Sequence, residues 1–112
     1  MKQPNAPDFM PGTLDMLVLK TLSRAPNHGW GIAQHINQVS QEALKIGEGS
    51  LYPALQRLLL DGYVEAEWGI SENNRRARFY RITTAGRKHL AEEKRSYDFL
   101  LAGIARVMEE AS

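Results

Sequence analysis

The sequence predicts a mainly α-helical domain with a small β-hairpin, an α+β fold, over most of its 112 residues. Three observations support this prediction. Apolar residues recur at helical spacing in three short segments before Gly62. After Gly62 the period falls to about two, which is typical of strands, over residues 64–68 and 78–83. A final segment, residues 85–108, returns to helical spacing and is the longest of all.

Residues 1–12 precede the first periodic segment. They contain three prolines and show no apolar periodicity, so we expect a flexible arm. The first helix is expected over residues 14–23, with Thr13 as its N-cap. Its apolar residues occupy more than one face, because Met16 and Leu19 point away from the stripe formed by the other leucines and Val18. A helix with this pattern is buried on more than one side.

The breaker cluster at residues 24–29 separates this helix from a second one, expected over residues 30–39. A third helix is expected from Ser50, as N-cap, to Asp61, with Gly62 as the C-terminal glycine. Pro53 then falls in the first turn, where its missing N–H costs no helical hydrogen bond. The apolar residues of this helix lie on one side, and the polar side carries Tyr52, Pro53, Gln56 and Arg57.

A polar loop, "GISENNRRA", joins the two strands and is suited to a hairpin. It places Arg75 and Arg76 at the hairpin tip and Arg78 where the second strand begins. Residues 64–88 contain six Lys or Arg and three Glu, so this part of the chain is basic. Residues 89–112 contain three Lys or Arg and five Asp or Glu, so the last part is acidic. Three short helices followed by a hairpin are the layout of a winged helix-turn-helix, which we assign to residues 13–84.

The third helix has the properties of a DNA-recognition helix. Its first turn offers backbone N–H groups, the Ser50 hydroxyl and the Tyr52 phenol to phosphates, and Pro53 stiffens that turn. Gln56 and Arg57 carry donors suited to base edges. Arg75, Arg76 and Arg78 would form the wing that reaches neighbouring phosphates or the minor groove. The Trp30 indole N–H is a further phosphate donor, although such a residue also suits a core. The alternative is that these polar faces contact only water.

The last helix, residues 85–112 with its short tail, carries an apolar stripe with little of its own chain to cover it. We therefore expect a homodimer in which this helix and the two-sided first helix form the interface. The interface residues expected are Leu90, Tyr97, Leu100, Leu101, Ile104, Met108, Met16 and Leu19. The alternative is a helix that folds back over its own domain. A two-fold dimer predicts a roughly palindromic double-stranded DNA operator with half-sites about one turn apart, or a multiple of it.

Composition excludes several functions. The absence of cysteine excludes disulfides, zinc–thiolate sites and cysteine nucleophiles. No apolar run approaches a membrane span and the N-terminus has no signal core, so we expect a cytoplasmic protein. The three histidines form no catalytic set, and His28 with His35 lacks a third metal ligand, so we expect no enzyme, metal or cofactor. A winged helix that contacts only protein or RNA is the main alternative, and salt dependence would distinguish it.

Four segments resemble the PadR family of bacterial transcriptional regulators: "GTLDMLVLKTL", "HGWGIAQHI", "GSLYPALQRLLLDGYVEAEWG" and "RRARFYRITTAGRKHL". The resemblance implies a winged-helix dimer of the family's short branch, usually a repressor of its own or neighbouring genes. It assigns Ser50, Tyr52, Pro53 and Arg57 to the DNA-reading helix and the three wing arginines to the wing. Some members respond to small aromatic or drug-like compounds. The dimer seam near Tyr97, Phe99, Leu101 and Ile104 is therefore a candidate effector site. The chain departs from the family at two places: the family often has Glu after the Arg-Leu pair of the third helix, where Leu59 and Leu60 stand here, and Tyr where Trp30 stands.

Overall fold

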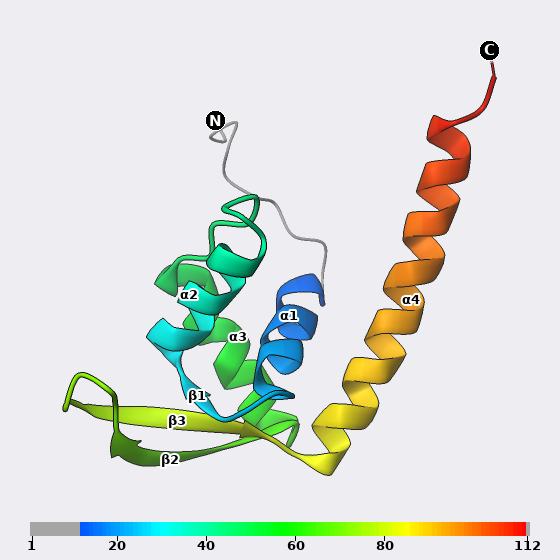
Figure 1. The fold of residues 1–112 in the computed structure, drawn as a ribbon. Coiled ribbons are helices and arrows are strands. Elements are labelled where there is room, and N and C mark those ends of the chain that lie inside the picture. The colour runs from blue at the N-terminus through cyan, green and yellow to red at the C-terminus, as the bar shows by residue number, and fades with distance from the viewer. Residues whose placement is uncertain (1–11, 112) are drawn as a thin grey trace.

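The structure, a computed structural model, describes residues 12–111. Its elements are α1 (Thr13–Leu22), β1 (Asn27–His28), α2 (Gly29–Val39), α3 (Glu48–Leu60), β2 (Val64–Ile70), β3 (Arg76–Ile82) and α4 (Thr84–Met108). Figure 1 shows α1, α2 and α3 on one side of the sheet, the hairpin projecting past α2, and α4 rising from the opposite end. The predicted α+β fold, a winged helix-turn-helix followed by a long helix, is confirmed. The predicted arm lies outside the described residues except for Gly12.

The sheet has three strands in the order β1-β3-β2, all antiparallel. The sequence prediction missed β1, because two residues before a helix carry no periodic signal. The hairpin is also longer than predicted, with pairs from Val64 and Ile82 out to Ile70 and Arg76. The connecting loop is therefore residues 71–75, and Arg76 belongs to β3 rather than to the tip.

The core lies between the three helices and one face of the sheet. The largest fully buried side chains of the helices are Val18, Leu19, Leu22, Ile32, Leu51, Leu55 and Leu58. Val64, Tyr80 and Ile82 close the core from the sheet. Each large aliphatic side chain buried in this way contributes roughly 1.5–3 kcal/mol to folding. This packing fixes α3 so that its opposite face points outward.

Two predicted N-caps are displaced by one residue. Thr13 lies inside α1, and the N-cap is Gly12, whose φ of 87° suits glycine. Thr83 rather than Thr84 caps α4, because its side chain accepts a hydrogen bond from Gly86 N–H at 3.0 Å. A Thr hydroxyl satisfies one of the otherwise unpaired N–H groups in the first turn.

The prediction that Gly62 ends the third helix is confirmed. Its φ is 76°, and the following residue, Tyr63, donates its N–H to the Leu58 carbonyl at 2.9 Å, as in a Schellman motif. The Tyr63 carbonyl then accepts from Thr83 N–H at 3.0 Å. A Cβ on Gly86 would collide with that carbonyl, so glycine allows the start of α4 to approach the sheet closely. Strand β3 therefore passes into α4 through a tight, hydrogen-bonded joint.

The turn between α2 and α3 is held by one asparagine. Asn37 Oδ1 accepts from Ile46 N–H at 2.7 Å, and its amide donates to the Ile46 carbonyl at 3.4 Å. Ile46 itself is buried in the core. Gly47, the N-cap of α3, directly follows Ile46, so these two hydrogen bonds fix the position at which α3 begins.

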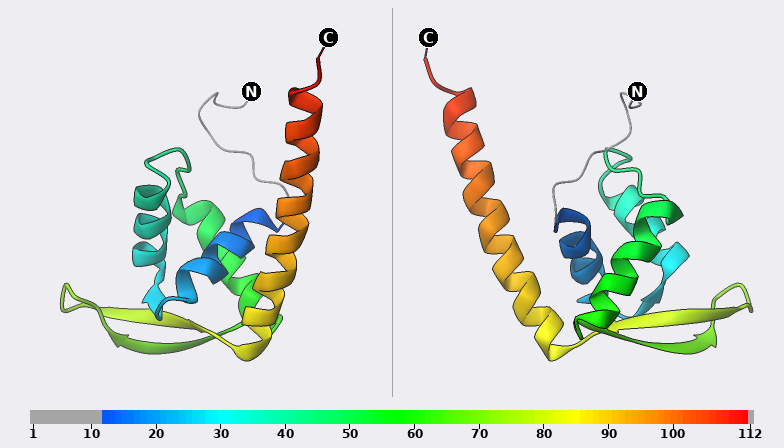
Figure 2. Two further views of the ribbon diagram at one scale, coloured as in Figure 1. Left: turned by 45° about the vertical axis from the view of Figure 1, so that its right-hand side comes forward. Right: turned by 180° about the vertical axis from the view of Figure 1, so that it is seen from behind.

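The α4 helix packs against its own chain along only part of its length. Leu90 is half-buried against the core, and α4 contacts α1. The prediction that this helix has little of its own chain to pack against is thus wrong for its first half. The second half extends beyond the other helices, as both views in Figure 2 show.

Candidate nucleic-acid interface

The outward face of α3 is the one the sequence assigned to DNA. Its exposed residues are Ser50, Tyr52, Pro53, Gln56 and Arg57. The opposite face, with Leu51, Ala54, Leu55 and Leu58, is at most 1% exposed. Core packing on one side therefore leaves the polar residues free to meet a ligand on the other. Leu60, an apolar residue at the end of this helix, is 78% exposed.

The beginning of α3 lies earlier than predicted. Gly47, in an extended conformation, precedes the helix, and Glu48 is its first residue. Ser50 is therefore inside the helix and does not cap it. Pro53 is the sixth helical residue, so its ring removes a hydrogen bond that the Gly49 carbonyl would otherwise accept. The prediction that this proline costs no helical bond is wrong.

This shift also changes what the helix end offers. The first N–H groups belong to Glu48 and Gly49, while those of Ser50 and Leu51 point to the Gly47 carbonyl at 3.3 and 3.0 Å. The Glu48 carboxylate lies at the positive end of the helix dipole, where it is stabilised. The same carboxylate opposes a phosphate at that position. The helix end is therefore less suited to a phosphate than the sequence predicts, and the exposed Ser50 hydroxyl and Tyr52 phenol are the remaining donors on this surface.

Tyr52 joins α3 to the start of α2. A Cβ on Gly29 would lie 2.7 Å from the Tyr52 hydroxyl, so glycine makes room for the phenol. The pKa of Tyr52 is raised, chiefly because the phenol is partly buried and to a smaller extent because of the charges of Glu48 and Tyr80 nearby. The phenol therefore stays protonated at neutral pH and can donate a hydrogen bond. Trp30 lies at the surface of α2, 54% exposed, and not in the core.

Arg57 is engaged with α1 as well as being exposed. Its Nη2 donates to Asp15 Oδ1 at 2.8 Å, and its Nε lies 3.5 Å from Asp15 Oδ2. This hydrogen bond is the main cause of the raised pKa of Arg57. The Nη1 group is not part of the contact, so the guanidinium can meet a base edge without leaving Asp15 entirely. The sequence prediction did not anticipate this partner, because the two residues are far apart in the chain.

Two of the three wing arginines lie on the sheet face that carries the helices. Cross-strand pairing places Arg76 opposite Ile70 and Arg78 opposite Trp68. The Arg76 guanidinium lies 4.5 Å from the centre of the Trp68 ring, and that of Arg78 lies 5.8 Å from the Tyr80 ring. Such cation–π contacts restrict long side chains that would otherwise sample many rotamers. These arginines are therefore positioned along the inner face of the hairpin, beside α2 and α3.

The third wing arginine, Arg75, belongs to the loop. Ser71 N–H donates to the Arg75 carbonyl at 2.8 Å, and Asn74 N–H to the Ser71 carbonyl at 2.9 Å. Asn74 has a φ of 57°, a conformation that asparagine tolerates better than most residues. The loop is thus a closed turn that fixes the backbone of Arg75 at the hairpin tip.

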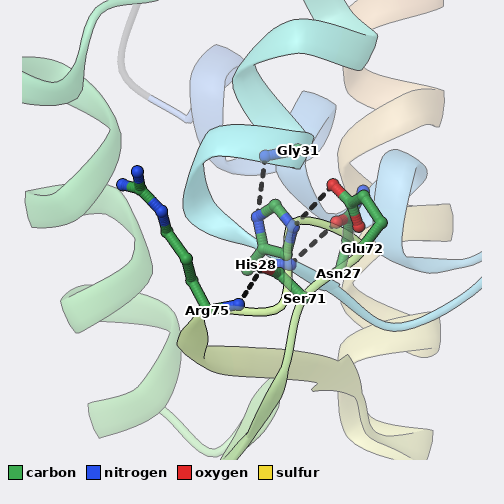
Figure 3. A network of polar contacts seen from close by, with 6 residues as sticks. All are labelled: Asn27, His28, Gly31, Ser71, Glu72 and Arg75. Atoms are coloured by element: carbon green, nitrogen blue, oxygen red, sulfur yellow. Dashed lines mark hydrogen bonds and ion pairs between the residues drawn. The ribbon is translucent and has the colours of Figure 1, made fainter.

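His28, which the sequence placed in a loop, is a buried part of the fold. Its Nδ1 accepts from Gly31 N–H at 3.0 Å and caps α2, and its Nε2 lies 3.3 Å from Glu72 Oε1 in the hairpin loop (Figure 3). The pKa of the Glu72 carboxyl is lowered, mainly because it accepts a hydrogen bond from the backbone N–H of Glu72 and secondly because of its hydrogen bond with the His28 side chain. Sequence spacing gave no signal for this pair, which spans 44 residues.

The predicted interface residues divide into three groups: four are exposed, two are buried and two are partly buried. Leu100, Leu101, Ile104 and Met108 are exposed on the second half of α4, together with Phe99 and Val107. Met16 and Leu19, by contrast, are buried in this chain; Leu19 is 0% exposed and packs in the core. Their assignment to a partner surface was wrong, because the second face of α1 is covered by the chain's own elements.

Leu90 and Tyr97 are partly buried, and both face the hollow between α4 and α1. Hollows between α1 and α4 are lined by Met16 together with Tyr97, and one of them also by Leu90 and Leu17. A separate groove on the second half of α4 is lined by Phe99, Leu100, Gly103, Ile104, Val107 and Met108. Of the four predicted effector residues, Tyr97 lines the hollows against α1, Phe99 and Ile104 line the open apolar groove, and Leu101 lines neither of these.

Within residues 12–111 no three His, Asp or Glu side chains lie close enough to hold a metal ion. Among the helices of these same residues, none combines the length and hydropathy needed to cross a membrane.

Comparison with known proteins identifies the family. The model of the transcriptional regulator PadR-like family matches residues 18–92. A transcriptional regulator of Mycobacterium tuberculosis is 36% identical over 65% of this chain and 64% of its own length. A transcriptional regulator from Clostridium thermocellum superposes with a TM-score of 0.77 at 28% identity, over 85% of this chain and 92% of that one. A PadR family transcriptional regulator from Eggerthella lenta superposes with a TM-score of 0.74 at 29% identity, over 89% of this chain and 85% of that one. The chain belongs to the PadR-like family of transcriptional regulators.

Proposed function

We propose that this protein binds double-stranded DNA sequence-specifically as a homodimer and represses its own or neighbouring genes. The observation that carries the proposal is the shared surface of α3 and the hairpin. The polar face of α3 is exposed, and three arginines lie along the adjacent wing. Membership of a family of transcriptional regulators supports it.

In this proposal residues 13–84 form the DNA-binding unit. Ser50 and Tyr52 hold phosphates, and the Trp30 indole N–H is placed to join them. Gln56 and Arg57 read base edges in the major groove. Arg75, Arg76 and Arg78 anchor the wing on phosphates or in the minor groove, where positive charge is favoured.

The dimer in this proposal is formed by residues 85–112. Six large apolar residues on the second half of α4 are between 41% and 80% exposed, which a second copy of the helix would cover. Two recognition helices at a fixed separation match a roughly palindromic operator with half-sites one helical turn apart, or a multiple of it. A small aromatic or drug-like effector would bind at the seam, near the apolar groove of α4.

Fluorescence anisotropy of the purified protein with a labelled duplex from its own upstream region tests the proposal. The assay is run at two salt concentrations with an excess of non-specific competitor. We expect competitor-resistant binding that falls steeply with salt and saturates at two chains per duplex. Binding that is absent, or fully removed by competitor on this duplex and on genomic fragments, would favour a winged helix that contacts protein or RNA.

A further inference from the structure

Glu72 is unexpected in a loop that the proposed function places against DNA. It lies at the hairpin tip, exposed, beside Asn73, Asn74 and Arg75. A carboxylate at this position repels phosphates, so electrostatics alone predicts that it weakens DNA binding. Its contact with His28 suggests a reason for its presence.

The His28 ring is held in one place by the folded core. Only 6% of the residue is exposed, and its ring packs edge-on against Phe79 at 5.3 Å between centroids. Its Nδ1 accepts from Gly31 N–H, which is a hydrogen bond that a protonated Nδ1 cannot make. The ring hydrogen therefore lies on Nε2 in the neutral form. Figure 3 shows that Nε2 faces Glu72.

Nε2–H is thus oriented to donate to Glu72 Oε1, 3.3 Å away. The two residues belong to different parts of the fold: His28 ends β1 and caps α2, whereas Glu72 lies in the loop at the far end of the hairpin. Because Ser71 and Arg75 are hydrogen-bonded across the same loop, holding Glu72 also holds the backbone of Arg75 and the start of β3.

We propose that the His28–Glu72 contact positions the wing relative to α2 and α3, so that Arg75 and Arg76 reach DNA. Both are positioning residues and need not touch the nucleic acid. This inference rests on the proposed function, since it assigns the contact a role in DNA binding. The energetic benefit of holding the wing must then exceed the repulsion between Glu72 and phosphate.

The sign of one substitution separates this proposal from simple electrostatics. Glu72→Ala removes the negative charge and the acceptor, and we expect it to weaken operator binding about two- to five-fold, the range of a partly exposed hydrogen bond to a carboxylate. Glu67→Ala is the matched control: it removes an exposed carboxylate from β2 of the same hairpin, and binding should be unchanged or tighter. Glu72→Gln keeps a carbonyl acceptor for Nε2–H and should bind at least as tightly as the wild type.

Two further measurements complete the test. In a variant that lacks Arg75 and Arg76, Glu72→Ala should cause no further weakening, because there is no wing contact left to position. In the free protein, hydrogen exchange of the amides of residues 71–76 should become faster in Glu72→Ala and stay slow in Glu72→Gln. If Glu72→Ala binds as tightly as Glu67→Ala, or if its loop amides exchange at the wild-type rate, the positioning role is overturned.

These results distinguish the inference from the function on which it rests. A wild-type protein that binds no DNA would overturn the proposed function, while the exchange experiment would still decide whether His28 and Glu72 hold the loop. A protein that binds its operator and loses affinity with the wing arginines, yet is insensitive to Glu72→Ala, would overturn only the positioning role.

Discussion

Arg57 provides the most informative test of how α3 would read DNA. We predict that Arg57→Ala lowers the discrimination between matched and scrambled duplexes by about 1–3 kcal/mol, the range of one arginine contact to a guanine edge. Discrimination is the relevant quantity, because the lost charge alone weakens binding to every duplex equally.

The structure adds a cost outside the DNA complex. Arg57 is paired with Asp15 at 2.8 Å, and the two side chains are 56% and 19% exposed. Such a solvent-exposed pair contributes about 0.2–1 kcal/mol to folding after solvent screening. Arg57→Ala should therefore lower the free energy of unfolding by no more than about 1 kcal/mol, and the variant should remain folded in a urea titration.

Asp15→Asn separates the two roles of this arginine. It keeps an acceptor for the guanidinium but removes the negative charge beside α3, so affinity for both duplexes should rise while discrimination is retained. Fluorescence anisotropy at one fixed salt concentration measures both quantities. Equal losses on matched and scrambled duplexes for Arg57→Ala would refute base reading and leave Arg57 as a phosphate contact or a structural residue.

Three other substitutions test separate parts of the molecule. Arg76→Ala should weaken all duplexes alike and reduce the slope of log affinity against log salt by about one, measured by anisotropy at several salt concentrations; a change in sequence preference would contradict this. Leu101→Glu should split the dimer, so an unchanged mass by light scattering would mean that the interface lies elsewhere. Gly86→Ala should lower the free energy of unfolding by about 1–3 kcal/mol, because its Cβ would meet the Tyr63 carbonyl. Wild-type stability in urea would show that the joint can relax.

Much of the fold was predictable because it depends on local patterns. The core face of α3 follows from the spacing of its leucines, and the left-handed Gly62 follows from the residue that most readily adopts that conformation. The change of period after Gly62 located the hairpin. These features need information from only a few neighbouring residues.

What the sequence did not predict depends on contacts between distant residues. Strand β1 exists because Asn27 pairs with Tyr80 and His28 with Phe79 of β3, residues that lie 53 and 51 positions further along the chain. The early start of α3 follows from the turn that Asn37 braces, not from a capping side chain. Leu19 seemed available to a partner because its helix is apolar on two sides, and only the packed fold shows that this chain covers both.

The candidate site shows the same division. The exposure of Gln56 follows from helical spacing, whereas the pairing of Arg57 with Asp15 and of His28 with Glu72 does not, because each joins separate elements. Charged and polar residues at a surface have many alternative partners, so their pairing cannot be deduced from spacing along one chain.

The joint between β3 and α4 has a consequence for how a bound molecule could affect the two wings. Thr83 is the single residue between the strand and the helix, and it is hydrogen-bonded to both Gly62 and Gly86. Because the connection is a single hydrogen-bonded residue, a rotation of α4 turns the hairpin with it. In a dimer, a compound inserted between the two α4 helices would change their crossing angle and thereby the distance between the wings. The fit to two half-sites would then be lost although the compound touches neither recognition helix.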